Sequence, residues 1–258
     1  MNRWSLYLTA YRTIVTKEIL RFTRIWMQTI LPSAITTSLY FVIFGKLIGE
    51  RIGEMGGYSY IEFIVPGLIL MSVIQNSYAN VVSSFFGTKL QHYIEEMLIA
   101  PVPDWVLLAG YVSGGVARGT LVGAVVTLIS LFFTDLSIYS YGLTLLVFVL
   151  TSILFALGGF INAVYDKTFD DVSIVPTFIL TPLTYLGGVF YSIELLPGFW
   201  QGVSLANPVL YMVNAFRQGL LGVSDIDILV AVTIILTFII ALILFSLNLL
   251  KRGVGIKK

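Results

Sequence analysis

The residue types that most often carry enzyme chemistry are sparse in this chain. His92 is its single histidine, it has no cysteine, and neither a metal-ligand cluster nor an H-E-x-x-H or G-x-S-x-G motif occurs. The stretch FGTKL, residues 86–90, ends like a P-loop but lacks the G-x-x-x-x-G-K spacing. The sequence therefore predicts that the chain is not an enzyme, binds no metal or cofactor, and does not hydrolyse ATP in the P-loop manner.

One stretch does combine ionisable side chains with helical spacing: TKLQHYIEEMLIAPVPDW, residues 88–105. A helix over 91–101 has two faces, an apolar one formed by Ile94, Met97 and Leu98 and a charged one formed by His92, Glu95 and Glu96. Pro101 and Pro103 end this helix because neither can donate an amide to a further turn. Two interpretations stay open, an ordinary interfacial loop helix and a rigid lever that contacts a partner.

Arg118 lies near the centre of a long apolar run, where a charge is costly and normally faces protein or water. It could bind an anionic headgroup or pair with an acid, but no acid lies at a comparable depth in another clear apolar run. A role in positioning its own helix is the preferred interpretation. The same run spaces glycines four apart, which predicts close approach of a neighbouring helix.

Two other apolar runs carry polar side chains at helical spacing. The first stripe consists of Thr29, Ser33, Thr36, Thr37 and Tyr40, and the second of Ser72, Gln75, Asn76, Ala79 and Ser83. Such stripes can line a translocation path, or can form hydrogen bonds between packed helices. Helix packing is the preferred interpretation for any single residue.

Apart from the helix over 91–101, the elements that hold these residues are predicted membrane spans. Of the 258 residues, 57% are hydrophobic and 11% charged, against about 25% charged in soluble domains. Five apolar runs are long enough to cross a bilayer, and a sixth, shorter run contains Pro176 and Pro182. The six predicted spans are residues 25–45, 63–86, 105–133, 141–164, 172–191 and 226–250. The predicted fold is an all-α membrane protein with one domain over 1–258.

The N-terminal residues 1–24 have a helical pattern with an apolar and a basic stripe. The apolar stripe is Leu8, Tyr11, Val15, Ile19 and Phe22, and the other is Thr13, Lys17, Arg21 and Arg24. This pattern predicts an amphipathic helix lying in the membrane interface before the first span. The alternative is a positively charged flank that only sets orientation.

Charge distribution predicts the topology. With six spans, one side collects Arg3, Arg12, Lys17, Arg21, Arg24, Lys89, Lys167, Lys251, Arg252, Lys257 and Lys258, and the other only Lys46, Arg51 and Arg217. The excess places both termini in the cytoplasm. The region after the sixth run is cut by Pro197, Gly198, Asn207 and Pro208 into apolar pieces of about ten residues, which predicts a re-entrant or interfacial segment. A seventh span over 195–216 would put the basic C-terminus outside.

Five stretches together carry a family resemblance over nearly the whole chain: FIVPGLILMSVIQNSYANVVSSFFGTK, IEEMLIAPVP, AGYVSGGVARG, KTFDDVSIVPTFILTPLTYLGGVFYS and LLPGFWQGVSLANPVLYMVNAFRQGLLG. The chain resembles the ABC-2 type permeases, the membrane subunits of ABC exporters. The resemblance implies a homodimer in the bacterial inner membrane beside two copies of a separate ATPase, which binds ATP and Mg. Net charge of +1 gives no reason to expect a nucleic-acid partner.

The resemblance implies that residues 193–216 form an external re-entrant hairpin between the fifth and sixth spans. It also implies roles for particular residues. The helix within 91–101 would be the coupling helix, with a neighbouring ATPase contact in the N-terminal helix; the implied contacts are His92, Tyr93, Ile94, Glu95, Glu96, Met97, Leu98, Pro101, Lys17, Glu18 and Arg21. Candidate pathway or gate residues are Thr36, Tyr40, Gln75, Asn76, Arg118, Tyr185, Phe190, Tyr191 and Trp200.

The sequence does not identify the transported substrate: a lipid, a glycan and a hydrophobic drug all remain candidate substrates. The alternative function is an ion-coupled secondary transporter or channel, which usually has mid-membrane acids that this chain lacks.

Overall fold

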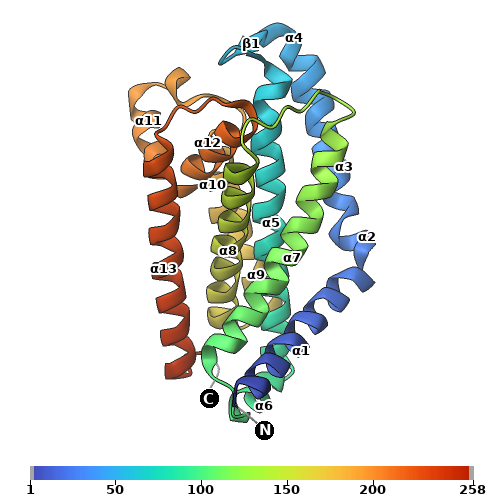
Figure 1. Cartoon of the computed structure of the whole chain (residues 1–258), viewed down its shortest axis with the longest axis vertical. Coiled ribbons are helices and arrows are strands. Elements are labelled where there is room, and N and C mark those ends of the chain that lie inside the picture. The colour runs from blue at the N-terminus through green and yellow to red at the C-terminus, as the bar shows by residue number, and fades with distance from the viewer. Residues whose placement is uncertain (1–2, 256–258) are drawn as a thin grey trace.

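Long helices run side by side along the molecule (Figure 1). The computed structural model describes residues 3–255, without the side chain of Lys46. Lys257 and Lys258 of the charge count, and residues 1–2 of the predicted N-terminal helix, lie outside the described residues.

Five helices in the described chain are long and apolar enough to cross a membrane. The first, Trp26–Ile52, is built from α2 (Trp26–Thr29), α3 (Leu31–Tyr40), the π-helix η1 (Phe41–Ile48) and α4 (Gly49–Ile52). The others are α5 (Tyr60–Leu90), α7 (Asp104–Ser130), α8 (Tyr141–Tyr165) and α13 (Ile228–Arg252). Each coincides with one of the five clear spans of the sequence, although the first and α5 are longer than predicted.

A shorter helix coincides with the sixth predicted span. It runs through α9 (Phe169–Val175), the π-helix η2 (Pro176–Leu180) and α10 (Thr181–Tyr185). The prediction of 172–191 placed its end six residues too late, because the chain leaves the helix after Tyr185 and turns at Gly188, which has a φ of 72°. Residues 169–185 extend about 25 Å, somewhat less than the ~30 Å hydrocarbon layer, so the six-span count remains a prediction.

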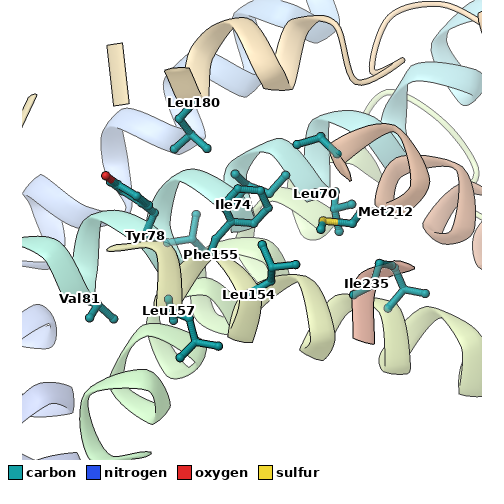
Figure 2. Packing of buried hydrophobic residues seen from close by; sticks show 14 of the residues in the cluster. Leu70, Ile74, Tyr78, Val81, Leu154, Phe155, Leu157, Leu180, Met212 and Ile235 are labelled. Atoms are coloured by element: carbon teal, nitrogen blue, oxygen red, sulfur yellow. The ribbon is translucent and has the colours of Figure 1, made fainter. Parts of the chain in front are cut away.

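The core is centred on α5, which is buried on nearly every side. Figure 2 shows Leu70, Ile74 and Val81 of α5 beside Leu154, Phe155 and Leu157 of α8. The predicted close approach at the α7 glycines is confirmed, since a Cβ on Gly119 would lie 2.0 Å from Ser77 Oγ. A side chain at this position would require at least the Ser77 hydroxyl to turn away.

The amphipathic helix α1 (Arg3–Arg24) packs against α7 with a face that overlaps the predicted apolar stripe only in part, at Tyr11 and Phe22. Its buried residues are Ile14, Glu18 and Phe22, whereas Leu8 and Ile19 of the predicted apolar stripe are exposed. The reason lies in α7, where Gly110 and Gly114 leave room for the side chains of Ile14 and Glu18. The contact is therefore set by glycines far away in the sequence.

Both described ends of the chain lie at one end of the bundle, together with α6 (Tyr93–Ile99) (Figure 1). The opposite end holds a two-residue turn between β1 (Glu54–Met55) and β2 (Tyr58–Ser59), which the sequence did not predict. At this same end, the region predicted as a hairpin over 193–216 forms three short helices, η3 (Ile193–Leu195), α11 (Gly198–Leu205) and α12 (Pro208–Leu221). Its re-entrant position in the membrane remains a prediction.

Candidate functional site

The short helix α6 presents the charged face that the sequence predicted. His92, Tyr93, Glu95 and Glu96 are exposed, while Ile94 is only 1% exposed. His92 precedes the helix with a φ of 62°, a value uncommon outside glycine, so the chain turns sharply between α5 and α6. The His92 Nδ1 lies 3.0 Å from Glu95 Oε1. The exposed face is available to a partner at the end of the bundle.

The other face of α6 rests on α5 and α7. The Tyr111 hydroxyl of α7 donates a hydrogen bond to Thr88 Oγ1 of α5, at 3.0 Å, and lies 3.8 Å from the Met97 sulfur. Ile94 packs into the same core. Three helices meet at these residues, so α6 is in direct contact with both α5 and α7.

A buried carboxylate ties α1 to α5. Glu18 is 0% exposed, and its oxygens accept hydrogen bonds from Ser84 Oγ at 2.5 Å, Arg21 Nη2 at 3.3 Å and Asn80 Nδ2 at 3.4 Å. Arg21 Nη2 also donates to the backbone oxygen and the Oδ1 of Asn80, both at 2.8 Å. The Glu18 side chain is enclosed by α5 and α7, so it presents no exposed surface in the described chain, and its contact with an ATPase stays a prediction.

Lys17 extends this network toward α6. Its ammonium donates to Thr88 Oγ1 at 3.4 Å and lies 5.6 Å from the centre of the Tyr111 ring. Burial lowers the pKa of Lys17, and the neighbouring charge of Glu18 opposes that shift. Thr88 and Tyr111 thus join the α1 cluster to Met97. We call Lys17, Glu18, Arg21, Asn80, Ser84, Thr88 and Tyr111 the coupling network.

Lys89 makes a connection that the sequence analysis missed. Its ammonium donates to the oxygens of Ala163 at 2.9 Å and Val164 at 2.7 Å and to the oxygen of Asp166, so it caps the last turn of α8. Beside it lies a cavity of about 640 Å³, lined in part by His92 and Glu95. Burial raises the pKa of Asp166 to about 6. No local pattern links residues so distant in sequence.

A second region is a groove between α3, α5 and the helix 169–185. It comprises two adjoining cavities of about 190 and 430 Å³, which share Gln75 and Thr181. Its hydroxyl and amide side chains are Ser33, Thr36, Thr37, Tyr40, Ser72, Gln75, Tyr78, Ser83, Ser173, Thr177, Thr181 and Tyr185. None of the described lining residues is charged. The two polar stripes of the sequence thus face each other here.

Four aromatic rings pack together where Tyr40 and Tyr185 line the groove. Phe190 packs on Phe44, Tyr40 and Tyr185 with ring centres 4.8, 5.8 and 5.7 Å apart. The hydroxyls of Tyr40 and Tyr185 are 2.7 Å apart. The π-helix η1 begins next to Tyr40 and η2 ends five residues before Tyr185, and such wide turns often occur at functional sites. We call Tyr40, Phe44, Tyr185 and Phe190 the aromatic cluster.

Comparison with known proteins decides the family. A family model described as "ABC-2 type transporter" matches residues 9–221. The chain belongs to the ABC-2 type transporter family. It is 57% identical over 252 residues to the "Inner membrane transport permease YadH" of Escherichia coli (strain K12), covering 98% of each chain. The "Nodulation protein J" of Rhizobium leguminosarum bv. viciae is 21% identical over 227 residues, 88% of each chain.

The ABC-2 assignment confirms the resemblance drawn from the five sequence motifs. The chain is a transport permease of the inner membrane with several spans, and membership implies association with an ABC ATPase. Membership of the ABC-2 type transporter family thus replaces the alternative interpretation, an ion-coupled carrier or channel.

Arg118 of this ABC-2 permease is held by an amide rather than an acid. Its Nε and Nη2 donate to Asn76 Oδ1 at 3.2 and 3.1 Å, and Asn76 Nδ2 donates to Ser33 Oγ at 2.9 Å. Through Asn76 of α5, these hydrogen bonds connect Arg118 of α7 to Ser33 of α3, which lines the groove. This arrangement fits the preferred positioning role of Arg118.

Other predicted pathway residues lie elsewhere. Trp200 is 47% exposed and packs on Phe199, and neither Trp200 nor Tyr191 is among the described lining residues of the groove. Arg217, counted as an external charge, is instead 1% exposed, with its guanidinium 3.8 Å from the centre of the Phe63 ring and Nη2 donating to Gly188 O at 2.6 Å. That correction follows from α12, which folds into the bundle.

Proposed function

We propose that this chain is the membrane subunit of an ATP-driven exporter, in which two copies work beside two copies of a separate ATPase and move a substrate outward. The observation that carries the proposal is the position of α5. Its end near Thr88 belongs to the coupling network, and its middle, at Ser72 and Gln75, forms a wall of the groove. One rigid helix therefore connects the exposed helix α6 to the candidate path.

The mechanism follows from this connection. Closure of the ATPase dimer on ATP would displace α6 through its exposed acids, and Met97 and Tyr111 would pass the displacement to α5. A shift of α5 would change the groove and separate the aromatic cluster. ATP binding and substrate affinity would then be coupled because both bias the same two-state element.

The second copy has a natural place beside the groove. The rims carry exposed apolar side chains, among them Ile35 and Leu39 of α3 and Phe178 and Ile179 of η2. A homodimer would cover these side chains and enclose the groove between two chains. Exposed apolar surface of this kind often marks an interface within a membrane or with protein.

Six spans with both termini in the cytoplasm complete the proposal. Two observations support it: the ends share one side of the bundle (Figure 1), and Lys251 and Arg252 lie there. A reporter fused to the C-terminus and active only in the cytoplasm should be active. Activity of an external reporter at that position would refute this topology.

The central experiment reverses one charge on α6. Glu95→Lys should leave the chain in the membrane but lower the ATPase activity of the complex at least tenfold, because Glu95 is exposed and its replacement opposes docking. The ATPase used is the one that co-purifies with the wild-type chain. Met97→Asp, which attacks the packed face of α6, should have the same effect.

Glu54→Lys is the matched control, since Glu54 is an exposed acid at the opposite end of the bundle. Normal ATPase activity and co-purification in Glu95→Lys would overturn the assignment of α6. Equal loss in Glu54→Lys would show that charge reversal acts through folding rather than docking.

A further inference from the structure

A hollow separate from the transport groove lies between α7, α8 and α13. Its volume is about 480 Å³. Small side chains on α7, Ala109, Ser113 and Ala117, form one side, and Leu157 of α8 and Leu247 of α13 contribute to the others. Ser113 carries the one hydroxyl among the described lining residues, and it is already paired with the Tyr11 hydroxyl at 2.8 Å. The hollow therefore suits a hydrocarbon chain rather than a polar ligand.

The length of this hollow matches one leaflet of a bilayer. Its α7 residues extend from Trp105 to Ala117, which is about 18 Å along a helix. The hydrocarbon layer is about 30 Å thick, so each leaflet contributes about half of that. Since Trp105 lies in the first turn of α7, at the α6 end of the bundle, the hollow lies in the leaflet on that side.

The mouth of the hollow has the chemistry of a headgroup site. The ring centres of Trp105 and Tyr7 lie 6.3 Å apart and the rings meet edge to face. Tryptophan and tyrosine are enriched at the membrane interface. On the opposite wall, Lys251 lies one helical turn beyond Leu247, and Arg252 follows it; both are exposed. The acid nearest to Trp105 in the chain is Asp104. The two basic residues Lys251 and Arg252 outnumber this single acid.

We propose that this hollow binds one acyl chain of an anionic phospholipid, with the phosphate held by Lys251 and Arg252. The two basic residues select the charge of the lipid, while the small residues of α7 admit its chain. This site lies on the side of the molecule formed by α13, apart from the groove lined by α3 and the helix 169–185. It rests only on the chain being a membrane permease, so it is independent of the proposed coupling to an ATPase.

Trp105 itself can report the lipid. In a variant that retains Trp105 as its only tryptophan, reconstituted in vesicles of phosphatidylcholine, brominated phosphatidylglycerol should quench its fluorescence at a lower mole fraction than brominated phosphatidylcholine, by about fivefold for each of the two basic residues. A basic residue near an anionic surface contributes roughly that factor. Lys251→Glu combined with Arg252→Glu should remove the preference.

A second variant tests the hollow itself. Ala117→Phe fills it and should weaken quenching by both lipids, whereas Ala124→Phe, an exposed position on the same helix outside the hollow, should leave quenching unchanged. Equal quenching by both headgroups in the starting protein would overturn the proposal, because any surrounding lipid would then suffice. A change of oligomeric state in Ala117→Phe would overturn it too, since the hollow would then be occupied by a second copy of the chain.

Discussion

The coupling network and the groove lie along the same helix but differ in charge. The network gathers Lys17, Glu18 and Arg21 around Asn80 and Ser84 of α5, with ionic groups partly or fully enclosed. The groove, further along α5, has hydroxyl and amide groups and no charged side chain among its described lining residues. Near one end α5 thus contacts charged groups of α1, whereas its middle lies among neutral groups.

This difference reflects two mechanical needs. Buried charges are stable only in fixed geometry with their partners, so the network holds α1, α5 and α7 as one unit through which a displacement can pass. A path must release what it binds, and neutral groups exchange hydrogen bonds with little change in free energy. The comparison predicts that charges are indispensable in the first region and harmful in the second.

The largest effect is expected from removing the buried acid of the network. Glu18→Ala leaves Arg21 without its carboxylate, and breaking such a pair typically costs about 3–5 kcal/mol. A large loss of thermal stability is expected, together with loss of ATPase stimulation in the complex. Glu18→Gln keeps acceptors for Ser84 and should retain part of the stability. A melting curve of Glu18→Ala like that of the exposed control Arg24→Ala would contradict the role of Glu18.

Introducing a charge into the groove should act on transport rather than on docking. Thr36→Asp places a carboxylate among neutral groups, where it is poorly solvated. The substrate-dependent ATPase activity of the complex, measured with a membrane extract as substrate source, should fall about tenfold while the affinity for the ATPase is unchanged. Thr23→Asp, exposed on α1, is the control. An unaltered Thr36→Asp protein would remove the groove from the path.

A smaller effect is expected at the aromatic cluster. Tyr40→Phe deletes one hydroxyl of the pair with Tyr185, which corresponds to about 1 kcal/mol for a typical hydrogen bond. If this contact favours the closed state, ATPase activity without substrate should rise about threefold to fivefold. Tyr211→Phe removes an exposed hydrogen bond to Leu205 O and serves as control. Equal basal activity in both variants would show that the pair does not hold the path closed.

The smallest effect is expected on the stability of the chain when Asp166 is changed. This residue directly follows the end of α8, next to Lys89. Its pKa rises from 3.8 to about 6 in the folded chain, so between these values the folded state binds more protons than the unfolded state. Stability from this group therefore falls as pH rises through that interval. Asp166→Asn should raise the melting temperature by about 2 °C at pH 8 and by less at pH 5. A gain that is larger at pH 5 would contradict this account.

The sequence predicted much of both regions where the signal is local. Helical spacing placed Thr36, Tyr40 and Gln75 on faces that line the groove, and the two faces of α6 agree with its burial. For α1 the same reasoning found Phe22 but not Ile14 and Glu18, which lie outside the predicted apolar stripe and are buried. A hydrophobic stripe cannot reveal that the contacting helix offers Gly110 and Gly114 to one particular register.

Hydrophobic length, proline stops and charge distribution by themselves determined the all-α membrane class, the five long helices and the position of α6, because each depends on residues near one another in the chain. The tertiary structure decided which polar groups are buried. Glu18 is enclosed by α5 and α7, Lys89 caps α8, and Arg217 lies against Phe63. These outcomes depend on how distant helices meet, and a buried charge is stable only when those helices supply its partners.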